Sequence, residues 1–136
     1  MEVSNKNLKV LVVGCGNMGA SHATAYHQLD GFEICGLVST GSSKQALNEK
    51  LGGGYRTFTD FEQALIETAP DAVCIATYPD THERFSIMAM EKGCHVFIEK
   101  PLADSLEGAK RVAAAAIKYD CKLLVGYILR YHPSWQ

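Results

Sequence analysis

The sequence has no excess of charge of either sign. Its 13 basic and 15 acidic side chains leave a formal net charge of −2. Such a balance provides no positive surface for nucleic acid or for an anionic membrane, so neither is an expected partner. Apolar residues make up 47% of the 136 residues and charged residues 21%. This composition is typical of one globular domain and excludes disordered or collagen-like chains.

Long apolar runs and paired cysteines are also missing. No stretch approaches the roughly 20 apolar residues that cross a bilayer. The first residues contain no apolar core of a signal peptide, so we expect a cytoplasmic protein. The cysteines are odd in number and form no CxxC pair: Cys15, Cys35, Cys74, Cys94 and Cys121. We therefore expect reduced thiols that pack in the core, and no metal site.

Short apolar runs alternate regularly with helical patterns. The best runs are apolar throughout, which is typical of strands buried on both faces of a parallel sheet. The expected strands are Leu8–Val13, Phe32–Ser39, Tyr55–Phe58, Ala72–Ala76, His95–Ile98 and Leu123–Tyr127. Strict alternation with helices predicts right-handed βαβ units. The fold class is therefore α/β, a doubly wound parallel sheet of six strands with flanking helices.

Helix signals fill the gaps between these strands. Two capping-box signatures begin at Asp80 and at Asp104, each with a glutamate three residues later. Glycines or a proline close several of the segments. The expected helices are Met18–Leu29, Ser43–Leu51, Asp60–Thr68, Thr81–Lys92 and a segment from the second signature to about Tyr119.

A glycine-rich loop follows the first strand and directly precedes the first helix. It reads Gly14-Cys15-Gly16-Asn17-Met18-Gly19, which is GxGxxG in its confirming strand-to-helix context. The first glycine permits a tight turn, the second lets backbone approach a pyrophosphate, and the third lets the helix lie close to the sheet. The free N–H groups of the helix then receive the phosphates. Two alternatives to a dinucleotide-binding loop are a glycine turn that only connects two elements and the glycine-rich loop of a methyltransferase.

The end of the second strand bears on the choice of nucleotide. An acidic residue about 20 positions past the loop would accept hydrogen bonds from the ribose of NAD. Ser39 stands there instead, and residues 39–44 contain no carboxylate. Hydroxyls of Ser39 and Thr40, a helix N-terminus and the mobile charge of Lys44 would suit a 2′-phosphate. NADP is favoured as cofactor, with NAD the alternative. The alternative without a phosphate is that Ser42 or Ser43 only caps the helix and that Lys44 is a solvated charge.

Three further segments resemble motifs of the Gfo/Idh/MocA oxidoreductases, the glucose-fructose oxidoreductase and inositol dehydrogenase family. Residues 72–82 are similar to the segment DAVxIATPxxxH, and residues 92–103 to the hallmark GKHVxxEKPLA. Residues 126–133 resemble GFxxRFxP. The resemblance implies a Rossmann NAD(P)-binding domain over residues 1–126. It also implies that residues 127–136 begin the crossing into a substrate-binding domain, which this sequence does not include.

The resemblance also implies an enzyme that oxidises or reduces a sugar, inositol or similar polyol, and a homo-oligomer when full length. Lys100 would be the catalytic residue, contacting the reacting hydroxyl and lowering its pKa, with Glu99 orienting the lysine or touching the cofactor. Arg130 would lie near the nicotinamide, or else form a salt bridge. The cofactor-binding residues expected from the loop and the resemblance together are Gly14, Gly16, Asn17, Met18, Gly19, Ser39, Thr40, Lys44, Ala76, Thr77, Tyr78, Pro79, His82, Glu99, Lys100 and Arg130.

The sequence departs from the family pattern in two places within the domain. Tyr78 stands where the family often has proline or asparagine, and no acidic residue follows the second strand. His22, on the first helix, is expected to be structural, whereas His82 is balanced between packing and cofactor contact. A nucleotide-sensing regulator, or a module that binds NADP without turnover, is the alternative function. Retention of Glu99-Lys100-Pro101 favours the enzyme.

Overall fold

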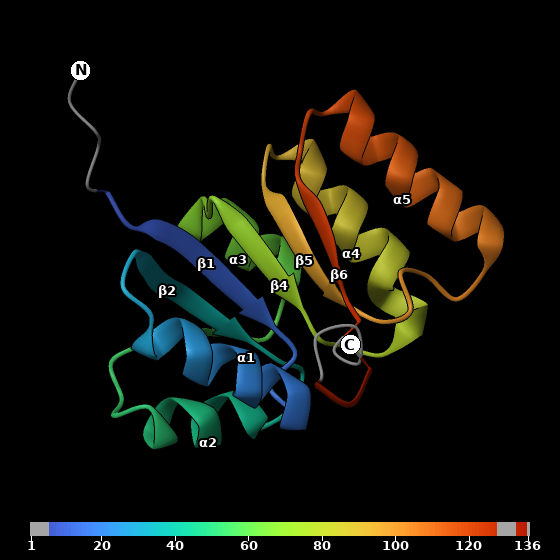
Figure 1. The fold of residues 1–136 in the computed structure, drawn as a ribbon. Coiled ribbons are helices and arrows are strands. Elements are labelled where there is room, and N and C mark those ends of the chain that lie inside the picture. The colour runs from blue at the N-terminus through green and yellow to red at the C-terminus, as the bar shows by residue number, and fades with distance from the viewer. Residues whose placement is uncertain (1–5, 128–132, 136) are drawn as a thin grey trace.

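The computed structural model describes residues 6–127 and 133–135, which form an α/β domain around one parallel sheet (Figure 1). The strands are β1 (Leu8–Val13), β2 (Phe32–Val38), β3 (Thr57–Phe58), β4 (Ala72–Ile75), β5 (His95–Glu99) and β6 (Leu123–Gly126). Their order in the sheet is β3-β2-β1-β4-β5-β6, and every pairing is parallel. The predicted doubly wound, six-stranded sheet is confirmed, and its order reverses direction between β1 and β4.

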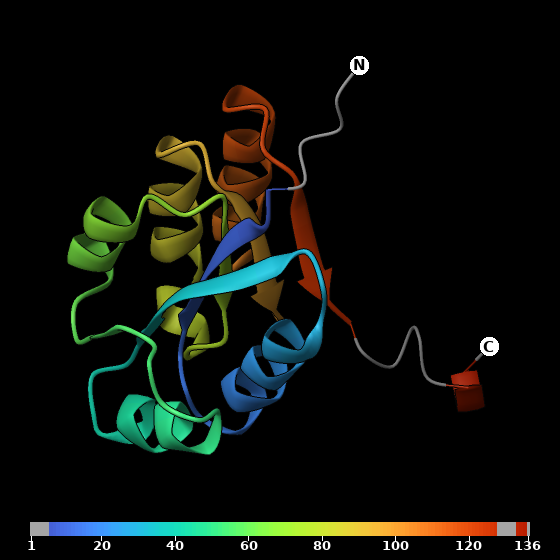
Figure 2. The same ribbon diagram turned by 90° about the vertical axis from the view of Figure 1, so that its left-hand side faces the viewer.

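Helices cover both faces of the sheet, as Figures 1 and 2 show from two sides. Side chains alternate along β1, so Val10 and Val12 pack under one layer while Leu11 and Val13 pack under the other. The first layer holds α1 (Asn17–Gln28) and α2 (Ser43–Lys50). The second holds α3 (Phe61–Thr68), α4 (Pro79–Glu91) and α5 (Leu106–Lys118). A short 3₁₀ turn, Pro133–Trp135, follows at the end.

The two expected capping boxes differ from the caps that the structure shows at the starts of α4 and α5. The capping box at Asp80 is wrong, because α4 begins at Pro79 with Tyr78 as its N-cap. Proline suits the first helical position, since the missing N–H has no helical partner there. Glu83 pairs with Arg111 on α5 instead. In α5 the cap is Ser105, whose hydroxyl accepts from the Gly108 N–H at 3.0 Å.

The described residues limit two other expectations. Most of residues 127–136 lie outside them, so the domain boundary at residue 126 stays a prediction. Within residues 6–127 and 133–135, no helix has the length and apolar character that a membrane crossing needs.

Two glycines bring the loop after β1 into direct contact with its neighbours. A Cβ on Gly19 would lie 1.8 Å from the Gly14 carbonyl oxygen, so α1 packs on this loop only through the bare backbone. A Cβ on Gly14, whose φ is +93°, would lie 2.4 Å from the Ala76 carbonyl oxygen. The loops after β1 and β4 therefore touch at the point where the strand order reverses.

Gly19→Ala is expected to destabilise the domain by about 2–4 kcal/mol, because α1 must move off the loop to make room for the methyl group. Urea unfolding followed by circular dichroism measures the change. Gly41→Ala is the matched control, since a Cβ there has no neighbour within 4 Å. Equal unfolding free energies of the two variants would show that the close approach of Gly19 to Gly14 does not contribute to stability.

Candidate functional site

A cleft of about 550 Å³ opens at the carboxyl ends of the strands, where the sheet changes direction. The loops after β1, β2 and β4 supply most of its wall, and residues from the loop after β3, from α3 and from the first half of α4 supply the rest. Its lining residues are Val13, Gly14, Cys15, Gly16, Asn17, Met18, Val38, Ser39, Thr40, Ser43, Thr59, Phe61, Ala76, Thr77, Tyr78, Thr81 and Phe85. Ligands bind at this position in open α/β sheets.

The N-terminus of α1 faces this cleft without a side-chain cap. Gly16 is the N-cap residue, and the first turn contains no acidic side chain. By contrast, Asp60 caps α3 and accepts from the Gln63 N–H at 2.8 Å. The first N–H groups of a helix need an acceptor, and the helix dipole favours an anionic one. The start of α1 can therefore bind a phosphate group.

Gly16 differs from the two glycines that flank it. A Cβ on Gly16 would have no protein atom within 4 Å, whereas those on Gly14 and Gly19 would collide with backbone. The space beside Gly16 is therefore open to the cleft. A ligand lying against the exposed start of α1 would occupy this space.

The loop after β2 is built around Lys44, whose side chain is only 6% exposed. The ammonium group donates to the carbonyl oxygens of Ser39 at 2.9 Å and Gly41 at 2.6 Å. The expectation of a mobile or solvated charge at Lys44 is therefore wrong. The lysine lies beneath the loop and does not line the cleft, so it fixes the loop and places a buried positive charge under it.

Ser39 and Thr40 line the cleft as expected, but the Ser39 hydroxyl is already engaged. Its proton is donated to the Gly41 carbonyl oxygen at 3.0 Å, and its oxygen accepts from the Lys44 N–H at 3.1 Å. Ser39 can still accept a hydrogen bond from a ligand. The exposed hydroxyl of Thr40 is the better donor from this loop.

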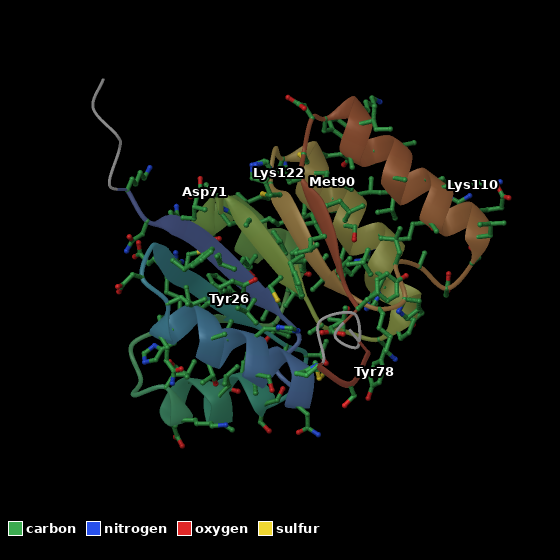
Figure 3. All side chains as sticks on the ribbon, viewed as in Figure 1. Tyr26, Asp71, Tyr78, Met90, Lys110 and Lys122 are labelled. Carbon is green, nitrogen blue, oxygen red and sulfur yellow. The ribbon has the colours of Figure 1, made fainter. Side chains whose placement is uncertain are left out.

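The loop after β4 faces the glycine loop across the cleft. The Thr77 and Thr81 hydroxyls lie 2.6 Å apart, and Thr81 also donates to the Tyr78 carbonyl oxygen at 2.8 Å. Ala76 and Tyr78 complete this wall, whereas Pro79 begins α4 outside the lining. The Tyr78 side chain is 82% exposed and projects from the carboxyl-terminal edge of the sheet (Figure 3).

His82 lies beneath this wall and not on it, with 1% of its surface exposed. Its Nδ1 is 2.6 Å from the Pro101 carbonyl oxygen, and its Nε2 is 3.0 Å from the Thr77 carbonyl oxygen. A neutral imidazole has one N–H, so only the doubly protonated ring donates to both. Since backbone carbonyls occupy both nitrogens, His82 supports the cleft and is not free to contact an occupant.

Glu99 and Lys100 leave β5 at the same edge of the sheet but do not line the cleft. The Glu99 carboxylate is buried and lies 2.6 Å from His22 Nε2 on α1, so His22 has the structural role expected of it. Lys100 is exposed, and Lys100-Pro101 is a cis peptide. Ile98 pairs with Ile75, and Lys100 and Thr77 follow two residues beyond them. Arg130 lies outside the described residues.

Several lining residues were not expected from the sequence as site residues: Cys15, Ser43, Thr59, Phe61, Thr81 and Phe85. Thr59 could have been found, because it follows β3 at the same sheet edge. Phe61 and Phe85 are apolar and give no sequence signal beyond core packing. Burial raises the pKa of the Cys15 thiol to about 11, so this side chain is an uncharged wall residue at neutral pH. Among the described residues, no group of His, Cys, Asp or Glu side chains could hold a metal ion.

Residues 8–127 match the model of a family described as an oxidoreductase family with an NAD-binding Rossmann fold. Inositol 2-dehydrogenase of Corynebacterium glutamicum is 32% identical over 133 residues, covering 96% of this chain and 40% of that protein. The 4-carboxy-2-hydroxymuconate-6-semialdehyde dehydrogenase of a Sphingobium strain is 30% identical over 129 residues, covering 95% of this chain and 41% of that protein. The chain thus spans about two fifths of these relatives.

Solved structures share the same fold. GenD2 from gentamicin A biosynthesis, in complex with NAD, is 30% identical with a TM-score of 0.86, covering 94% of this chain and 36% of that one. Apo scyllo-inositol dehydrogenase from Lactobacillus casei has a TM-score of 0.88 at 24% identity, covering 97% of this chain and 40% of that one. At that identity the second likeness concerns the fold alone.

Gly16→Val is expected to abolish dinucleotide binding while lowering the unfolding free energy by only about 1 kcal/mol, the cost of valine at the N-cap of α1. The side chain would fill the open space beside Gly16 and exclude the pyrophosphate, removing several hydrogen bonds of roughly 1 kcal/mol each. Calorimetric titration with NADP and NAD measures the loss, and urea unfolding is the control. Unchanged affinity in a folded variant would contradict binding at this loop.

Proposed function

We propose a function from the premise that this chain belongs to the Gfo/Idh/MocA oxidoreductase family. It is the cofactor-binding domain of a dehydrogenase acting on a sugar, inositol or related polyol. The observation that carries the proposal is the cleft at the glycine loop, with open space beside Gly16 and an uncapped helix start. The NAD complex of GenD2 supports a dinucleotide in this fold. The inositol dehydrogenases among the relatives support the substrate class.

The proposed cofactor is NADP, with NAD as the alternative. No carboxylate follows β2 to accept from a ribose hydroxyl or to repel a 2′-phosphate. The buried ammonium of Lys44 lies beneath the loop, and α2 begins beside it, so both favour negative charge there. Because Lys44 is held by carbonyl oxygens, its contribution is a field at short range and not a direct contact.

Ser39→Asp is expected to reverse the cofactor preference. The wild-type chain should bind NADP about tenfold more tightly than NAD, the equivalent of one net charge-assisted hydrogen bond. The new carboxylate would repel the 2′-phosphate and accept from the 2′-hydroxyl of NAD. Dissociation constants of both nucleotides on both proteins measure the ratio.

Two results would count against this assignment. Tighter binding of NAD by the wild-type chain would make NAD the cofactor. An unaltered ratio in the variant would show that Ser39 does not face the ribose.

Lys100 is proposed as the catalytic residue. It follows β5 at the sheet edge next to the loop that carries Thr77. Within the described residues, no side-chain hydrogen bond or ion pair occupies its ammonium group, which is exposed. A free ammonium at this edge could donate a hydrogen bond to a substrate hydroxyl oxygen and stabilise the alkoxide left when a base removes the hydroxyl proton. A bound nicotinamide would supply the hydride acceptor.

Lys100→Met is expected to lower kcat by about 100-fold or more, the usual scale for a positioned group that handles a proton. The measurement is the reduction of NADP or NAD, with a panel of sugars and polyols, by the full-length enzyme that contains this chain. Cofactor affinity should change little, because the lysine does not line the cleft. Turnover near the wild-type rate would make the lysine structural.

A further inference from the structure

Lys100 stands between two residues that are each anchored to a histidine. Glu99, on its N-terminal side, is paired with His22, and the carbonyl oxygen of Pro101, on its other side, faces His82. The two histidines come from different layers, since α1 covers one face of the sheet and α4 the other. The backbone of the Lys100 segment is thus fixed from both faces while its side chain stays exposed.

His82 contacts two loops that lie next to each other at the carboxyl edge of the sheet. One ring nitrogen faces the Pro101 carbonyl oxygen, next to Lys100, and the other faces the Thr77 carbonyl oxygen in the cleft wall. The ring itself is 1% exposed, so it is held between the two loops inside the protein. The ring lies between the two carbonyl oxygens at hydrogen-bond distance, so it sets the separation of the two loops.

The His22 contact reaches the glycine loop in a similar way. His22 lies on α1, whose first turn follows Gly16, and its ring packs edge-on against Phe97 with centroids 4.9 Å apart. The Glu99 carboxylate is enclosed by this ring and by Gly126, where a Cβ would lie 3.2 Å from Glu99 Oε1. A shift of α1 would therefore be transmitted to the residue before Lys100.

We infer that His82, with His22 in a secondary role, is a positioning residue that couples the dinucleotide cleft to the Lys100 segment. This inference rests on the proposed function, because the occupant of the cleft is the dinucleotide. A dinucleotide bound against Thr77 restrains that loop, and His82 passes the restraint to Pro101 and Lys100. The lysine is then ordered at the sheet edge once the cofactor is in place.

Hydrogen exchange of the chain with and without saturating NADP tests the coupling. In the wild-type chain the nucleotide should slow exchange of amides 14–19, and also of amides 97–104, the latter by about tenfold, the equivalent of one net hydrogen bond. In His82→Leu the effect at 97–104 should fall below about twofold while that at 14–19 persists. His82→Gln keeps an N–H donor and should restore part of the effect.

Ser86→Ala is the matched control. Ser86 lies one turn further along α4, is fully buried, and its hydroxyl has no hydrogen-bond partner among the described residues. This variant perturbs the packing of α4 without touching the two carbonyl contacts. It should keep the wild-type response at both segments, which separates loss of coupling from general loosening of the helix.

Two outcomes would overturn the inference, and they are distinguishable. Undiminished protection of 97–104 in His82→Leu would show that the nucleotide orders this segment directly or by another route. No protection at 14–19 in the wild-type chain, with either NADP or NAD, would overturn the proposed function and the coupling with it. If His82→Leu fails to fold, His82→Gln decides. Protection of 97–104 at the full wild-type level in that variant would show that the imidazole is not needed for the coupling.

Discussion

Backbone contact between the loops after β1 and β4 is the constraint on which the cleft depends. The contact exists because Gly14 and Gly19 have no Cβ, so that the start of α1, the Gly14 carbonyl and the Ala76 carbonyl come within touching distance. The sheet order reverses at this point, and helices leave to opposite faces from it. The N–H groups of α1 consequently face an open cleft. A side chain at either glycine would separate these parts before any ligand arrived.

The polar side chains that support the site, Lys44, His82 and Glu99, are more deeply buried than the polar side chains that line it. Lys44 and His82 contact backbone carbonyl oxygens, and Glu99 pairs with His22, so each of these polar side chains has a partner inside the protein. These contacts fix the three loops that surround the cleft. Thr40, Tyr78 and Lys100 remain exposed for a ligand. Such a division suits a site whose cleft loops are arranged before binding, because part of the ordering cost is then met when the domain folds.

The sequence predicted the sheet well because its signals are local and strong. Runs such as Leu8–Val13 have one plausible structure, and the glycine loop marks the first crossover. The errors arise where the outcome depends on residues distant in sequence. Nothing near Lys44 shows that its ammonium turns back to Ser39 and Gly41, and nothing near His82 shows that Pro101 lies beside it. Asp80 failed as a cap because Pro79 already fits the first helical position. The sequence pattern of apolar lining residues such as Phe61 does not distinguish them from core residues.

The position of Lys44 changes the physical basis of cofactor choice. A solvated lysine reaching a phosphate would be screened by salt and would lose side-chain entropy on binding. A buried ammonium that is already held by two carbonyls loses no such entropy, and the lower dielectric strengthens its field on a group bound above the loop. The Ser39 hydroxyl cannot add a donor of its own, because its proton points to Gly41. Under the proposed preference for NADP, discrimination against NAD would rest on the charge beneath the loop and on Thr40. A carboxylate at residue 39 would offset that charge.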